Sequence, residues 1–145
     1  MSIIKKTIFL LILILSFTSL NAQEIKKIGK FKDWETIVVS SETAKLCFAQ
    51  SKPVLQSPKN NTREARLFIS FRPNEKITDE VSITSGYEYN VQNAILAKSG
   101  KNKIKFDISK DNFAWIANNK VEKKIISVMK KGSRIMINII FQINR

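Results

Sequence analysis

The chain has 145 residues, with 25 Lys and Arg against 12 Asp and Glu, a formal net charge of +13, no histidine, one cysteine and four glycines. Without histidine there is no Ser-His-Asp set, no imidazole base and no His-ligated metal, and a single cysteine forms neither an internal disulfide nor a Cys₄ zinc site. Four scattered glycines provide neither a Walker loop nor a dinucleotide fingerprint, so the composition excludes many familiar cofactor and catalytic classes.

Residues 1–22 have the three parts of a secretory signal peptide. Two lysines give a basic start, residues 8–17 are almost uninterrupted Ile, Leu and Phe, and the segment ends at Ala22. A transmembrane anchor is the alternative, but it needs about 20 apolar residues, and the segment 7–20 is only 14 residues long. We therefore expect an exported protein, in the periplasm or on the outer cell surface, with the signal peptide cleaved near Ala22. The mature chain 23–145 then carries 23 basic and 12 acidic residues, a formal charge of +11.

Short strands dominate the predicted structure of this mature chain. Residues 23–32 are polar and basic and are interpreted as a loose lead-in. Alternation is clearest at 65–71, where every second side chain is apolar, and it recurs at 104–108. Turns rich in Ser, Asn, Pro and Gly separate the candidates. The predicted strands are 34–39, 44–50, 65–71, 81–84, 104–108 and 135–143.

One helix interrupts the strands. Asn118 or Asn119 can cap it, Glu122 lies in its first turn, and Gly132 ends it. Its apolar face is formed by Val121, Ile125, Val128 and Met129, at helical spacing. Many short strands with frequent turns, no linker and one short helix near the C-terminus predict a mostly β chain that forms a single β-sandwich over 23–145.

Candidate catalytic side chains are few. Cys47 lies in an apolar strand, and we interpret it as a small buried hydrophobe, with an intermolecular disulfide as the alternative. Asp79 and Glu80 are adjacent on a strand and so point to opposite faces, while Asp107 and Asp111 are isolated. We expect no catalytic, cofactor-binding or metal-ligating residue and no cofactor. An enzyme would need two carboxylates brought together from distant parts of the chain.

Aromatic side chains offer a second kind of candidate, stacking on a ligand base or sugar. The segment 113–117 is apolar, so we interpret the two tryptophans as core residues and keep ligand stacking as the alternative. The aromatic candidates are Trp34, Tyr87, Tyr89, Phe113 and Trp115.

The basic charge has two explanations. It would draw nucleic acid, lipopolysaccharide or an anionic membrane. The lysines are, however, spread through nearly every turn, Lys outnumbers Arg 20 to 5, and Lys, Ile and Asn all have A/T-rich codons, so a compositional bias would give the same excess. Arginine, the usual specific reader of phosphate, is scarce, and an exported protein rarely meets nucleic acid. We expect no nucleic-acid partner and keep an anionic envelope or host-surface component open.

Several local patterns occur in an order that resembles the invasion-associated locus B family of exported bacterial proteins. They are F-K-D-W at 31–34, C-F-A-Q at 47–50, K-P-V at 52–54, I-S-F-R-P at 69–73, V-S-I at 81–83 with G-Y at 86–87, A-W at 114–115, and M-K-K-G-S at 129–133 leading into I-M-I at 135–137. The resemblance implies an immunoglobulin-like β-sandwich, an exported location and, in some pathogens, a part in host-cell entry. It implies no established catalytic residue.

Two departures from the family matter. Members often carry a cysteine shortly after the tryptophan, where this chain has residues 37–39 as Ile-Val-Val, so Cys47 lacks that partner. Members also tend to continue with a further turn and a final strand, so we expect this chain to be C-terminally shortened. The apolar strand 135–143 would then lie at a sheet edge, where a second copy can pair with it. We therefore expect a homodimer through this edge.

The sequence thus predicts an exported, non-enzymatic, periplasmic or surface-associated protein that supports host-cell interaction or the cell envelope. The alternative is an envelope-binding module whose Lys-rich surface holds anionic lipid or lipopolysaccharide.

Overall fold

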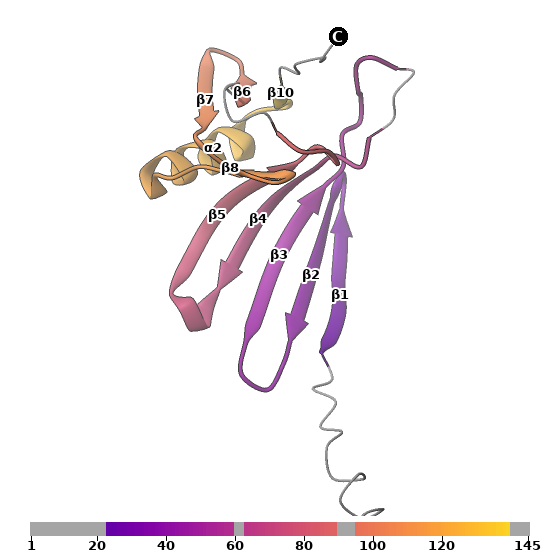
Figure 1. Ribbon diagram of the computed structural model, residues 1–145, viewed down its shortest axis with the longest axis vertical. Coiled ribbons are helices and arrows are strands. Elements are labelled where there is room, and N and C mark those ends of the chain that lie inside the picture. The colour runs from indigo at the N-terminus through magenta and orange to yellow at the C-terminus, as the bar shows by residue number, and fades with distance from the viewer. Residues whose placement is uncertain (1–22, 60–62, 90–94, 140–145) are drawn as a thin grey trace, which may run out of the picture.

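The computed structural model describes residues 23–59, 63–89 and 95–139. In this part of the chain it shows a mostly β structure with two sheets and one short α-helix near the C-terminus (Figure 1). The predicted fold class is confirmed at that level. The predicted signal peptide, 1–22, lies outside the described residues. Among the described residues, no helix combines the length and the apolar character that crossing a membrane requires.

The two sheets are antiparallel throughout the described residues. The larger has seven strands in the order β1-β2-β3-β4-β5-β9-β8, and the smaller has three in the order β10-β6-β7. The elements are β1 (Glu24–Phe31), β2 (Trp34–Ser40), β3 (Lys45–Ser51), β4 (Arg66–Arg72), the 3₁₀ turn η2 (Pro73–Glu75), β5 (Ile77–Thr84), β6 (Ile95–Ser99), β7 (Asn102–Phe106), β8 (Ile108–Lys110), β9 (Phe113–Trp115), α2 (Asn119–Lys131) and β10 (Met136–Asn138).

Strand β1 corrects the expectation of a loose lead-in at 23–32. It pairs antiparallel with β2 along nearly its whole length, from Glu24 opposite Ser40 to Phe31 opposite Trp34. Backbone hydrogen bonds to the edge of β2 need no apolar side chains, so a basic segment can form this strand. Its side chains stay outside the core, and the exposed lysines suit an edge strand.

The core lies where β4, β5 and β9 face the smaller sheet and α2. Alternation places Leu67, Val81, Ile83 and Ala114 on one face of the larger sheet, and all four are buried. They pack against buried residues of the smaller sheet and of the helix, which are Ile95, Ala97, Ile104, Phe106 and Ile125.

Helix α2 begins and ends as predicted. The side chain of Asn118 accepts a hydrogen bond from the backbone N–H of Lys120 at 2.9 Å, and Gly132 is the C-cap. Gly132 has an ordinary φ of −91°, so a left-handed turn is not why glycine is needed. A Cβ there would lie 2.9 Å from the Ser99 hydroxyl oxygen. The glycine therefore allows the helix end to approach β6 closely.

Strands β1, β2 and β3 extend away from the helix and the smaller sheet, which gather near β5 and β8 (Figure 1). Trp34 and Cys47 are consequently half-buried, which corrects the interpretation of Cys47 as a buried hydrophobe and places Trp34 at the margin of the core. Two phenylalanines of the larger sheet, Phe71 and Phe31, are 38% and 69% exposed.

The C-terminal strand is shorter in the described residues than predicted. β10 covers Met136–Asn138, pairs with β6 and lies at the edge of the smaller sheet. Ile135, Ile137 and Ile139 pack against the core, as the alternation predicts. The rest of the predicted strand, 140–143, lies outside the described residues, and dimerisation through this edge stays a prediction.

The core arrangement predicts that Ile125→Ala destabilises the protein by about 2–5 kcal/mol, because the side chain is fully buried between the sheets. Its neighbour Ile126 is only half-buried, so Ile126→Ala is the matched control and should lower the free energy of unfolding by less. Urea unfolding followed by circular dichroism measures both values. Equal losses would contradict the placement of Ile125 at the centre of the core.

Candidate functional site

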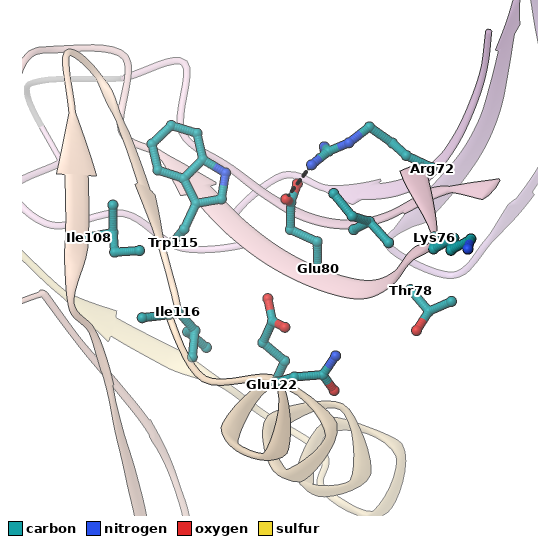
Figure 2. Close-up of a pocket in the computed structure, with 11 residues that line it drawn as sticks. Arg72, Lys76, Thr78, Glu80, Ile108, Trp115, Ile116 and Glu122 are labelled. Carbon is teal, nitrogen blue, oxygen red and sulfur yellow. Dashed lines mark hydrogen bonds and ion pairs between the residues drawn. The ribbon is translucent and has the colours of Figure 1, made fainter. Parts of the chain in front are cut away.

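A groove of about 550 Å³ opens where β5, β9 and the start of α2 meet (Figure 2). Both charged and apolar side chains face it, and they come from segments far apart in the sequence. The lining residues are Arg72, Lys76, Ile77, Thr78, Glu80, Ile108, Trp115, Ile116, Ala117, Asn119 and Glu122.

The groove forms because β9 is much shorter than β5. β9 pairs only with residues 82–84, so the first half of β5 has no β9 partner on that side. The N–H of Val81 donates instead to the Oε1 atom of Glu122 in the first turn of α2, at 3.0 Å. A side-chain oxygen thus replaces the missing strand, which keeps a buried amide hydrogen-bonded. The helix then starts beside β5, and the groove is the space left in front of it.

A β-bulge aims the β5 side chains into the groove. Ser70 pairs with Glu80 and Arg72 pairs with Ile77, so the three residues 70–72 of β4 oppose the four residues 77–80 of β5. Ser70 and Arg72 are two apart and share a face, which brings their partners Glu80 and Ile77 to that face. Asp79 lies in the bulged part of β5 and has a left-handed backbone conformation, with φ of 61°. The bulge therefore sets Glu80 beside Arg72.

Arg72 and Glu80 form a bidentate ion pair on one wall of the groove. The Nη1 atom of Arg72 donates to Oε1 of Glu80 at 2.8 Å and Nη2 donates to Oε2 at 2.6 Å, while Nε donates to Glu75 at 3.0 Å. The hydrogen bonds to Glu80 raise the pKa of Arg72. Parallel N–H···O bonds fix both planar groups in orientation. This wall is polar and rigid.

Glu122 is a nearly buried acid that reaches from α2 toward β5 (Figure 2). The residue is 7% exposed, and only its Oε1 atom has a hydrogen-bond partner among the described residues. Burial raises the pKa of Glu122, and the nearby acids Glu80 and Asp79 act in the same direction, while the bond from Val81 opposes them.

Trp115 supplies the aromatic wall, and its position corrects its interpretation as a core residue. It is half-buried on β9 and faces the groove, with its ring stacked on that of Phe113 at 5.7 Å between centroids. Its partner in β5 is Ser82, so Trp115 points away from the face that carries the buried Ala114. Ligand stacking, the alternative for this residue, stays a prediction.

The other sequence candidates lie elsewhere. Tyr89 is buried, which raises its pKa to about 12, and its ring centroid is 6.0 Å from that of Tyr87. Asp107 accepts the N–H of Ala117 at 2.8 Å, and Asp111 lies in the turn between β8 and β9 with φ of 54°. Within the described residues, no three Cys, Asp or Glu side chains gather as metal ligands would.

The sequence predicts Glu122 only as an acid in the first turn of the helix. A signal for its burial was present, because it lies three residues before Ile125 and seven before Met129, on the apolar side of α2. An acid at such a position is expected to have a buried partner. Asp79 and Glu80 are expected to point to opposite faces of their strand, and only Glu80 lines the groove.

Charge is distributed unevenly between the two parts of the chain. Residues 95–139 contain 11 Lys and Arg against 3 Asp and Glu, whereas 23–89 contain 11 against 9. Lysines are spread through the sequence as predicted, but acids are concentrated in the first part. The excess of positive charge therefore belongs to the smaller sheet, α2 and the short strands β8 and β9.

The outer side of the smaller sheet carries three lysines, which we call the lysine face: Lys98, Lys103 and Lys105. Lys98 lies directly opposite Lys103, and Lys105 lies two residues further along the same side of β7. Within the described part of the chain, none of the three forms an ion pair. Like charges opposite each other on a sheet are unfavourable, so this arrangement opposes folding and suits an anionic partner.

Comparison with models of protein families, with curated proteins and with solved structures gives no match. The family resemblance therefore rests on the sequence patterns alone.

The burial of Glu122 in the groove predicts that the free energy of unfolding depends on pH. Because burial raises its pKa, the folded protein holds this proton more tightly than the unfolded chain. The stabilising contribution is complete below the ordinary value of 4.5 and is lost as the pH rises through the raised pKa. Relative to Glu122→Gln, which keeps an acceptor for Val81, the wild-type free energy of unfolding should fall as the pH rises above 4.5.

Urea unfolding at several pH values measures this difference. Glu42→Gln, in the exposed turn between β2 and β3, controls for the loss of one negative charge. A wild-type value that rises with pH relative to Glu122→Gln would contradict the assignment.

Proposed function

We propose that this chain is an exported, non-enzymatic protein of the invasion-associated locus B family, in the periplasm or on the outer cell surface, that supports the cell envelope or host-cell interaction. The ordered sequence patterns support the family, and the basic and apolar start that ends at Ala22 supports export. An immunoglobulin-like sandwich is part of the same proposal. Two sheets around a shared core support it, while the β1 to β5 meander differs from Greek-key connections.

The molecular activity that we propose is binding of an anionic envelope component, lipid or lipopolysaccharide, through the lysine face. The observation that carries this is the concentration of positive charge in residues 95–139. Basic residues near an anionic membrane each contribute about 1 kcal/mol of attraction. A rigid sheet holds the three ammonium groups on one side, so they can act together on one charged surface.

A function in binding and not in catalysis agrees with the hydrogen bonds that the two groove carboxylates already make. Both oxygens of Glu80 accept hydrogen bonds from Arg72, and Glu122 holds the N–H of Val81. A carboxylate that takes part in hydrolysis must be free to attack, to activate water or to transfer a proton. Here these groups are engaged in holding β4, β5 and α2 together.

The proposal predicts that the mature chain binds vesicles of phosphatidylcholine with 30% phosphatidylglycerol at low salt. Substitution of the lysine face by K98Q/K103Q/K105Q should weaken this binding roughly 100-fold, since three contributions of about 1 kcal/mol are lost. Co-sedimentation with the vesicles at a series of salt concentrations measures the affinity, which should fall as salt rises.

K26Q/K30Q/K52Q removes the same charge from exposed positions in the first part of the chain and is the matched control. It should change the affinity much less. Equal losses in both variants would show that only net charge matters, and absence of binding at low salt would reject the proposal.

A further inference from the structure

We propose that the groove between β5, β9 and α2 binds a neutral saccharide, with Trp115 as the stacking surface and Glu122, Asn119 and Thr78 as hydrogen-bonding groups. This site goes beyond the proposed function, because it shares no residue with the lysine face. Its success or failure is therefore independent of anionic binding.

The apolar wall of the groove fits the C–H face of a sugar ring. Trp115 lies beside Ile108, which is 48% exposed, and both side chains face the groove (Figure 2). The tryptophan ring is held by its stacking on Phe113, with an interplanar angle of 23°. Amphipathic aromatic rings fixed in this way provide contact area at low entropic cost. The large exposed isoleucine next to it has no other evident role.

Several polar groups on the groove have no partner in the described part of the chain. They are the indole N–H of Trp115, the second carboxyl oxygen of Glu122, the side-chain amide of Asn119 and the hydroxyl of Thr78. Together they include donors, acceptors and groups that act as both. Sugar hydroxyls also donate and accept, so a saccharide can satisfy this mixed set better than a ligand with acceptors only.

Charge balance in the groove favours a neutral ligand. Two cationic residues, Arg72 and Lys76, line it together with two acidic ones, Glu80 and Glu122. An anionic ligand would approach the acid of Glu122, and a cationic one would compete with the two bonds that Arg72 makes to Glu80. The balance contrasts with the excess of positive charge in residues 95–139.

Backbone strain lies along the β5 side of the groove. Lys76 has φ of 57° and Asp79 has φ of 61°, and both lie within the segment whose side chains line it. A left-handed conformation is unfavourable for residues with a side chain, and strain of this kind clusters at ligand sites. The volume of about 550 Å³ is within the range of small-molecule sites.

The test is saturation-transfer NMR on the mature chain with two neutral trisaccharides, triacetylchitotriose and maltotriose. We expect at least one of them to bind saturably, with Kd of about 1 mM or lower, as suits an open groove. The affinity should fall at least tenfold in Trp115→Leu. It should fall measurably in Thr78→Ala, which removes a single hydroxyl from an exposed position and leaves the core unchanged. Trp34→Leu replaces the other half-buried tryptophan, outside the groove, and should leave the affinity unchanged.

Three outcomes would overturn the proposal. They are no saturable binding of either sugar at 20 mM, equal losses in the Trp34 and Trp115 variants, and saturable binding of tetramethylammonium at Trp115 in place of the sugars, which would assign the groove to a cation. Binding followed by cleavage of the trisaccharide would support the site and contradict the non-enzymatic part of the proposed function. Vesicle binding in each variant separates this result from that of the lysine face.

Discussion

The structure depends on how the first half of β5 is completed where β9 stops. β9 pairs only with residues 82–84 of β5. Without another acceptor, the backbone amide of Val81 would be buried with no hydrogen-bond partner. Glu122 accepts its hydrogen bond at 3.0 Å, which fixes the first turn of α2 against the larger sheet. An unsatisfied buried amide costs about 1–3 kcal/mol, so this contact favours one position of the helix. Three residues later, Ile125 is then fully buried.

The fold presents two surfaces with different chemistry. One is the groove, where opposite charges are balanced and Trp115 is accessible. The other is the lysine face of the smaller sheet, where alternation turns apolar side chains toward the core and ammonium groups outward. Glu122 is central to the first surface and, through α2, helps to cover the core beneath the second. The same acid therefore links the stability of the fold to both proposed binding sites.

Much of the local structure follows from the sequence. The limits of α2 follow from Asn118 and Gly132, and the strand at 65–71 follows from strict alternation, because both signals are local. β1 did not follow, since its pairing depends on the backbone edge of β2 and not on its own side chains. The groove did not follow either. Glu80, Trp115 and Glu122 meet only because a bulge and a short strand bring three segments together, and neither feature is a periodic pattern.

The most direct test of the account is a map of backbone amide shifts in the ¹⁵N-labelled mature chain, recorded separately with anionic bicelles and with triacetylchitotriose. We predict that the bicelles shift amides of β6 and β7 around Lys98 and Lys103, and that the saccharide shifts those of Val81, Trp115 and Asn119. Two separate sets of residues would establish two distinct surfaces. Shifts from both ligands in one common set, or confined to β1, β2 and β3, would contradict it.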